Sequence, residues 1–202
     1  MRASVTRMSI NVPGGGRPDG DGVLLYPEVA AQPGAATVDI YEDFQCPYCA
    51  QFEHQNGASV KALARDGRVI VVVHMMTFLD ENFGNDSSRR AANAAFGAAD
   101  AGHFADFHST VFANQPDEGG GYTDDELVGF GQQVGIESTA LDTFSGVVRE
   151  HTYADYVAAT EQRAEVNGVQ GTPGFFVNGR QLSDPAVLQD LLTRRASFEE
   201  LI

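Results

Sequence analysis

The sequence predicts an α/β domain that is interrupted by a block of helices. Three observations lead to this prediction: two β-rich segments separated by a helical segment, a stretch from residue 84 to 167 without a convincing strand, and a return of strand character near residue 175. A strand–helix–strand order implies parallel strands joined by a right-handed crossover. Helices that lie between two such strand regions suggest an inserted helical subdomain.

The sequence of residues 1–76 predicts a flexible tail, an edge strand and the strand–helix–strand unit. Residues 1–22 are rich in Gly, Pro, Asp and Arg, which favours a flexible tail. The short apolar run at 23–26 predicts an edge strand that ends at Pro27. Strand 37–41, a helix over 47–64 and a continuous β-branched strand at 69–76 follow in order. Such an unbroken apolar run is typical of a strand buried on both faces.

Apolar spacing predicts helices over 87–101, 103–113, 123–134 and, as one or two helices, 138–166. Thr123 and Glu126 stand three positions apart, as in a capping box. The phenylalanines of 104–112 are expected in the core of this block. After it, 175–177 predicts a strand, Asn178-Gly179 a hairpin turn and 180–182 the return strand. Asp184 then caps a helix that runs to about residue 195.

The composition indicates a globular protein and argues against nucleic-acid binding and a membrane span. Hydrophobic residues make up 43% and charged residues 20% of the 202 residues, which is a globular composition. The formal net charge of −15 repels phosphate backbones, so nucleic acid is not an expected partner. No apolar run is long enough to predict a membrane span. The first 22 residues lack the apolar region of a signal peptide, which leaves a cytoplasmic location or a removed signal or anchor as alternatives.

The chain has two cysteines, Cys46 and Cys49, in a C-x-x-C arrangement where a predicted strand meets a predicted helix. Unpaired N–H groups and the helix dipole stabilise an anion at a helix N-terminus, so Cys46 is placed to be a thiolate. Pro47 is compatible with the first turn. Cys49 lies one turn further on the same side. This arrangement favours a reactive first cysteine and a more buried second one.

Three other interpretations of the cysteines stay open on spacing alone. A structural disulfide would close a very short loop and stabilise the fold only weakly. A zinc site would need about four ligands, and only His54 and His74 are plausible additions. Two inert core cysteines are the third alternative. The five histidines match no motif and are expected to be structural or exposed (His54, His74, His103, His108 and His151).

Two motifs resemble a known family. Residues 41–49, Y-E-D-F-Q-C-P-Y-C, are similar to the active-site segment of DsbA-like thioredoxin-fold disulfide oxidoreductases. Residues 168–179, G-V-Q-G-T-P-G-F-F-V-N-G, are similar to their cis-proline loop, strand and hairpin. The resemblance implies a thioredoxin-like fold, with a central mixed sheet flanked by helices. It divides the chain into a tail at 1–22, a thioredoxin-like domain of 23–83 and 168–202, and a helical insertion at 84–167.

The resemblance also implies roles for the site residues. Cys46 would be the nucleophile that holds a mixed disulfide, and Cys49 would resolve it. Pro47 and Tyr48 form the dipeptide between them. A cis Pro173, with Thr172 before it, would face Cys46 and pair with an extended substrate. No metal or organic cofactor is implied.

One position departs from the family pattern. Many relatives carry a buried acid six positions before the first cysteine, as a proton acceptor, whereas this chain has Ile40 there. Glu42 shares a strand face with Ile40 and is a candidate replacement. The alternative is that Glu42 is a solvated or ion-paired carboxylate.

The expected function is disulfide transfer to substrate proteins, as a DsbA-like oxidase. The same residues can also work as a reductase or isomerase, and Pro-Tyr is the dipeptide of glutathione-linked glutaredoxins. A non-catalytic peptide-binding module is the alternative of another class. The expected partners are thiol-containing substrate proteins or peptides and a redox-recycling partner. Family analogy favours the cell envelope, with the cytoplasm as the alternative.

Overall fold

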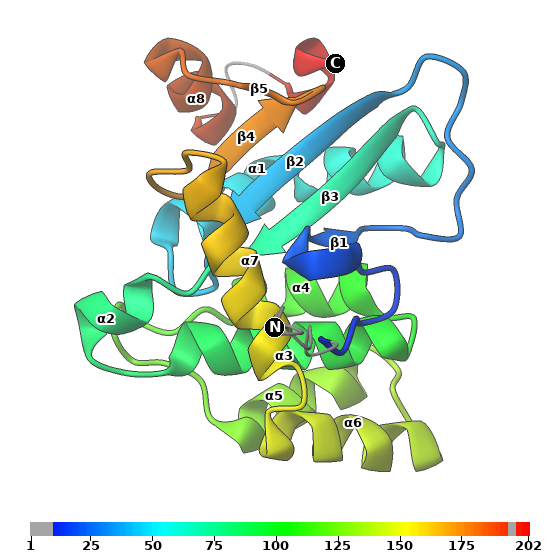
Figure 1. The fold of residues 1–202 in the computed structure, drawn as a ribbon, viewed down its shortest axis with the longest axis vertical. Helices are drawn as coiled ribbons and strands as arrows, with labels where there is room; N and C mark the ends of the chain where they lie inside the picture. Colours follow the sequence, from blue (N-terminus) through cyan, green and yellow to red (C-terminus); the bar gives the residue numbers. More distant parts are fainter. Residues whose placement is uncertain (1–9, 194–196) are drawn as a thin grey trace, which may run out of the picture.

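A computed structural model describes residues 10–193 and 197–202, which form a five-stranded sheet with helices on both faces (Figure 1). The strand order is β1-β3-β2-β4-β5. Only β2 and β3 are parallel within this sheet, and the other neighbours are antiparallel. The sheet is therefore mixed, as predicted. Its strands are β1 (Val23–Leu24), β2 (Ala36–Glu42), β3 (Val69–Met75), β4 (Gly174–Val177) and β5 (Arg180–Gln181).

The predicted strand–helix–strand unit is present. Helix α1 (Pro47–Arg65) connects β2 to β3, and these strands pair in parallel with Val38 opposite Val71. The β-branched run of β3 lies between β1 and β2 and is almost wholly buried. This unit places the C-terminal end of β2 directly before the N-terminus of α1, where the cysteines lie.

The stretch from 84 to 167 contains helices and turns and no strand. Figure 1 shows α3, α4, α5 and α6 gathered beyond one end of the sheet, while α7 returns along the face opposite α1. The predicted capping box of Thr123 and Glu126 begins α5. The helices are α2 (Leu79–Phe83), α3 (Ser87–Asp100), α4 (Phe104–Ala113), α5 (Asp124–Gln133), α6 (Ser138–Glu150) and α7 (Ala154–Val166).

The aromatic stripe of α4 is core, as expected. Phe104, Phe107 and Phe112 are all buried, and Phe107 meets Phe144 of α6 edge-on. The fold prediction is therefore confirmed: a thioredoxin-like arrangement with a helical insertion.

The segment before β1 differs from the expected loose tail. Residues 1–9 of that tail lie outside the described residues, but 10–22 pack on the body of the protein. Tyr156 of α7 donates a hydrogen bond to the carbonyl of Arg17 or Gly22, each 2.8 Å away. Gly20 has φ +75°, and a Cβ there would meet the backbone of Ala159 at 2.6 Å. The glycines that suggested flexibility instead allow tight turns and a close approach to α7.

Smaller differences concern boundaries. Helix α2 was not expected. The segment 138–166 is two helices, which separate at His151, a residue with φ 51°. Helix α8 (Pro185–Leu192) is capped by Asp184 as predicted but ends before residue 195, and 194–196 lie outside the described residues.

Candidate active site

Cys46 is the N-cap residue of α1, immediately after the turn that follows β2. Its N–H donates to the carbonyl of Asp43 at 2.9 Å, and its own carbonyl accepts from the N–H of Ala50 at 3.1 Å. Pro47 occupies the first helical position, where a missing N–H costs little. The backbone therefore points the free N–H groups of the first turn at the Cys46 side chain.

The surroundings of Cys46 favour its thiolate. The pKa of Cys46 is lowered from 9.0 to about 6, first by a hydrogen bond from Cys49 and also by Thr172 and by backbone N–H groups of Cys49 and Tyr48. Burial works in the opposite direction but is outweighed. Pro47 and Tyr48 are both exposed, Tyr48 by 60%, so the dipeptide between the cysteines faces solvent.

Cys49 has the opposite environment. It is completely buried, and burial raises its pKa well above the usual value. The neighbouring Cys46 and the charge of Glu42 raise it further. Both cysteines are free thiols in this structure. At neutral pH the pair is therefore one thiolate and one thiol, with the thiol donating to the thiolate.

The loop before β4 faces Cys46. The Thr172–Pro173 peptide bond is cis, as predicted. The carbonyl oxygen of Thr172 lies 3.4 Å from Cys46 Sγ. The Thr172 hydroxyl is buried and has no other hydrogen-bond partner in the described residues, so it is available to donate to a thiolate. The structure thus brings together Cys46, Cys49 and the Thr172–Pro173 loop from opposite ends of the sequence.

Glu42 is neither solvated nor exposed. Its side chain is 1% exposed at the end of β2, and Oε2 lies 2.9 Å from Nε2 of His108. Burial raises the pKa of Glu42, although His108 partly offsets this. Its other oxygen, Oε1, has no hydrogen-bond partner among the described residues. The contact agrees with the ion-paired alternative for Glu42, and His108 is a buried histidine whose contact with Glu42 was not predicted.

A buried polar network holds the turn between β2 and α1, and sequence reasoning missed it. Asp43 Oδ1 accepts from the N–H of Gln45 at 2.8 Å and from the hydroxyl of Ser88 at 2.6 Å. The Gln45 amide reaches Ser88 and Asp80 at 2.8 and 2.9 Å. The only signal in the sequence was the run of polar residues beside two cysteines. Their partners on α2 and α3 are set by tertiary packing.

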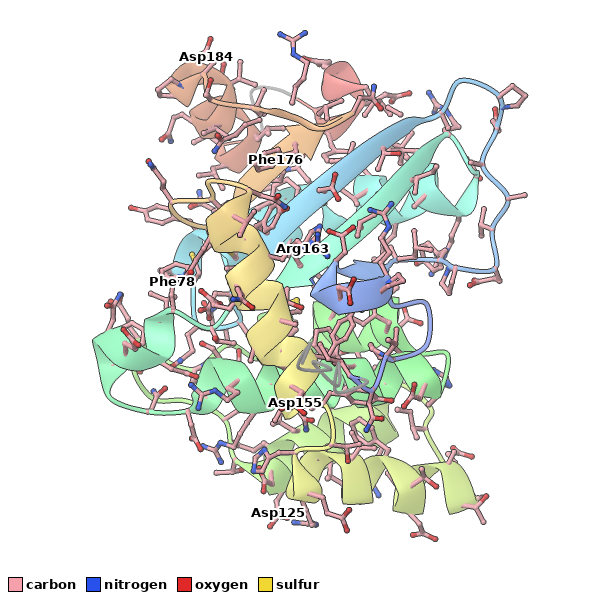
Figure 2. The ribbon with its side chains drawn as sticks, viewed as in Figure 1. Phe78, Asp125, Asp155, Arg163, Phe176 and Asp184 are labelled. Carbon is pink, nitrogen blue, oxygen red and sulfur yellow. The ribbon has the colours of Figure 1, made fainter. Side chains whose placement is uncertain are left out.

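The helical insertion also holds the cysteine turn from its other side. The Gln115 amide donates to the carbonyls of Phe44 and Cys46 at 2.8 and 3.1 Å. The Tyr122 hydroxyl donates to the carbonyl of Phe44 at 3.1 Å. Figure 2 shows Phe78 and Phe176 on either side of α7, where they pack on a small cluster of Tyr41, Met76 and Ala164.

The described residues contain no group of three or more His, Cys, Asp or Glu side chains arranged to hold a metal ion. His74, one of the two candidate zinc ligands, bonds Asp39 at 3.0 Å. None of the described helices is both long and apolar enough to cross a membrane.

Comparison with known proteins agrees with this geometry. The family model described as thioredoxin matches residues 32–193, which include both cysteines and the Thr172–Pro173 loop. The chain belongs to the thioredoxin family.

Solved thioredoxin-fold structures are similar over most of the chain. The reduced disulfide oxidoreductase DsbG of Mycobacterium tuberculosis is 30% identical, with a TM-score of 0.65, over 87% of this chain and 88% of that one. Oxidised DsbA of the same organism is 28% identical, with a TM-score of 0.64, over 81% and 88%. MdbA of Corynebacterium diphtheriae shares the fold at 18% identity, with a TM-score of 0.73, over 95% and 97%.

The curated relatives are longer proteins. A Na⁺/H⁺ antiporter, NhaA 1 of Salinispora arenicola, is 32% identical over 72% of this chain but only 20% of its own length. The serine/threonine-protein kinase PknE of Mycobacterium tuberculosis is 30% identical over 85% of this chain and 31% of its own length. The chain thus spans a third or less of these relatives.

Proposed function

We propose that this protein is a DsbA-like oxidase that transfers a disulfide to thiol-containing substrate proteins. The observation that carries the proposal is the asymmetry of the cysteine pair: a pKa of about 6 for Cys46 beside a deeply buried Cys49 whose pKa is raised. A stabilised thiolate favours the reduced form of the pair, because the disulfide gains nothing from that stabilisation. A protein whose reduced form is favoured oxidises other thiols.

The reaction is a thiol–disulfide exchange. A substrate thiolate attacks Cys46 Sγ, the Cys46–Cys49 bond breaks, and its electron pair goes to Cys49. A second substrate thiol then displaces Cys46 and leaves it as the stabilised thiolate. Thr172 and the cis Pro173 would pair with the extended substrate beside Cys46, and Pro47 and Tyr48 would form the rim between the cysteines. Glu42 would handle the proton of Cys49. No metal or organic cofactor is part of this scheme.

The proposed domain division follows the same logic. The thioredoxin-like domain, 23–83 and 168–202, carries the cysteines and the proline loop, while the insertion at 84–167 positions them. The DsbA and MdbA neighbours support a location in the cell envelope by analogy. An unidentified partner would reoxidise Cys46 and Cys49.

The direction of electron flow is tested by equilibrating the protein with reduced and oxidised glutathione and trapping its thiols with an alkylating agent. We expect the reduced form to predominate in a buffer that keeps ordinary structural disulfides oxidised, and the oxidised form to convert a reduced, unfolded substrate to its disulfide. A Cys46→Ser variant is the control without exchange.

If the disulfide form predominates at equilibrium, the protein is a reductase and the oxidase proposal fails. If wild-type Cys46 exchanges with neither glutathione nor substrate, the catalytic proposal itself fails and a peptide-binding module becomes the better assignment.

A further inference from the structure

His108 connects the helical insertion to the buried side of the cysteine pair. Helix α4 places its ring among Phe44, Phe104 and Phe112, and the side chain is 5% exposed. Nε2 lies 2.9 Å from Glu42 on β2, and Nδ1 lies 4.0 Å from Glu53 on α1. The ring therefore hydrogen-bonds Glu42 and lies at ion-pair distance from Glu53, two carboxylates that belong to different elements.

One carboxylate oxygen of Glu42, the more deeply buried of the two glutamates, has no hydrogen-bond partner among the described residues. Glu42 Oε2 is taken by His108, but Oε1 is buried without a hydrogen-bond partner in the described part of the chain. A buried carboxylate oxygen without a hydrogen-bond partner lowers the stability of the fold. That cost is reduced when the oxygen takes up a proton or accepts a hydrogen bond from water. The charge of Glu42 also acts on Cys49, which places the two groups within electrostatic reach of each other.

The outer carboxylate leads to the surface. Glu53 and Lys61 line a small, partly open pocket together with Glu42 and His108. The same two residues line a wider hollow on the protein surface, beside His54 and Ser109. The Ser109 hydroxyl donates to Glu53 at 2.6 Å and accepts from Lys61 at 2.6 Å. Glu53 is therefore the point where the buried cluster meets solvent.

We propose that His108 relays the proton of Cys49 between Glu42 and the partly exposed carboxylate of Glu53. This inference rests on the proposed function, and it makes the helical insertion part of the proton chemistry. When the disulfide closes, the Cys49 thiol gives its proton to Glu42 Oε1. The resulting thiolate attacks Cys46 Sγ, a Cys46–Cys49 bond forms, and the substrate sulfur leaves Cys46 with the bonding electron pair. Glu42 then gives a proton to His108 Nε2, and the ring releases the proton on Nδ1 to Glu53 when one of the two side chains turns to close their 4.0 Å separation. Glu53 passes that proton to solvent.

The reverse reaction uses the same path inward. Substrate thiolate attacks Cys46, Cys49 leaves with the electron pair of the broken bond, and the relay returns a proton to it. The charged groups that face His108 are Glu42 from β2 and Glu53 and Lys61 from α1. Burial alone lowers the pKa of His108, but the two carboxylates raise it, and the net shift is upward. Since burial also raises the pKa of Glu42, the pair holds its proton to a higher pH than free side chains do.

The experiment separates the two steps of disulfide closure with oxidised glutathione as the probe. Reduced protein is mixed with oxidised glutathione over a pH series, and samples are quenched in acid and alkylated. Mass spectrometry of the intact protein then counts the protein in each disulfide state. The Cys46–glutathione mixed disulfide forms first and reports Cys46 alone. Its conversion to the Cys46–Cys49 disulfide follows and requires the proton of Cys49 to leave.

We expect His108→Gln to leave the first step unchanged and to slow the second by at least about tenfold at neutral pH, since a positioned proton-transfer group contributes roughly 10²–10⁴-fold. Glutamine can keep a hydrogen bond to Glu42 but cannot carry a proton. His74→Gln is the matched control, because His74 is also buried and also bonds a carboxylate, that of Asp39. It should leave both steps at the wild-type rate.

Each result has a defined meaning. An unchanged second step in His108→Gln overturns the relay, and so does an equal slowing of both steps or an equal slowing by His74→Gln. Absence of the first step in the wild-type protein instead overturns the proposed function. If His108→Gln does not fold, the wild-type His108 ring is titrated by NMR, with Phe104 and Phe112 as neighbours for its assignment. The relay predicts different titration midpoints in the oxidised and reduced protein, and coincident curves overturn it.

Discussion

At the scale of single residues, two cysteines three positions apart have opposite properties. Cys46 is the N-cap residue of α1 and has hydrogen-bond donors around its sulfur. Cys49 lies in the core with Phe52 and the buried end of β2. Hydrogen bonds donated to a thiolate lower the pKa of its cysteine, whereas burial without such hydrogen bonds raises it. The same side chain is therefore a hydrogen-bonded thiolate at one position and a protected thiol one helical turn later.

The first prediction concerns the titration of Cys46. Its thiolate should form with a midpoint at about pH 6, measured by the pH dependence of alkylation or by thiolate absorbance. Cys49→Ala should raise this midpoint, because the hydrogen bond from Cys49 contributes most to the lowering. Thr172→Val, which removes a hydroxyl at nearly constant volume, should raise it by less.

A Cys46 midpoint near 8.5, the usual value for a free cysteine, would contradict the role of the helix N-terminus. So would a Cys49→Ala variant that titrates at the same pH as the wild-type protein.

At the scale of elements, helix α5 shows how closely the helical block is packed. Gly131 faces α6, and a Cβ built there would lie 2.3 Å from the ring of Phe144. That ring is buried and packs edge-on against Phe107, so it cannot move aside. Gly129, two positions earlier on the same helix, has nothing within 4 Å of its Cβ position. The two glycines thus differ in their surroundings while they share a helix.

The second prediction compares these two positions. Gly129→Ala should stabilise the protein by about 0.5–1 kcal/mol, since alanine is the better helix former. Gly131→Ala should destabilise it by roughly 1–3 kcal/mol, because overpacking outweighs the same gain. Urea unfolding of both variants provides the measurement. Equal effects of either sign would show that α5 and α6 are not packed as described.

The third prediction concerns the contact between α3 and the cysteine turn. Ser88→Ala removes a hydroxyl that bonds both Asp43 and Gln45, and all three side chains are buried. Both partners keep another hydrogen bond, and the loss of these two buried hydrogen bonds, at about 0.5–1.5 kcal/mol each, would be detected by chemical denaturation. Ser197→Ala is the control, because Ser197 is exposed and its removal should change stability by less than about 0.5 kcal/mol. A neutral Ser88→Ala would mean that the turn is held by its backbone alone.

At the scale of the whole molecule, the redox state should change the pH dependence of stability. The folded pKa of Cys46 lies below its unfolded value, so the stabilisation is fully present above the unfolded pKa near 9.0 and is lost as the pH falls through about 6. The disulfide form has no such titration. The raised pKa of Cys49 acts in the opposite sense, but only above the unfolded value.

The fourth prediction follows from this difference. Relative to the oxidised protein, the reduced protein should gain about 2–3 kcal/mol of unfolding free energy between pH 5 and pH 8. Urea unfolding of both forms across this range measures it, and groups that titrate alike in both forms cancel in the comparison. Parallel pH profiles for the two forms would contradict a thiolate that exists only in the reduced state.

Much of this architecture was predictable because its signals are local in the chain. Period, turn residues and caps identified β2, α1, β3, the capped α5 and the hairpin after Pro173, since each depends on residues a few positions apart. The two cysteine-containing and proline-containing motifs identified the site for the same reason. Helix α2 escaped prediction because five residues show no clear period. The packed segment before β1 escaped because its glycines serve contacts with α7 that composition does not reveal.

The sequence by itself determined that Cys46 begins a helix, that Cys49 follows one turn later and that a Thr-Pro loop precedes a strand. The tertiary structure decided which distant side chains complete the site. Glu42 and His108 are 66 positions apart, and Asp43 and Ser88 are 45 apart. No local pattern predicts such a pair, because each partner satisfies a buried polar group whose burial exists only once the helical insertion has packed against the sheet.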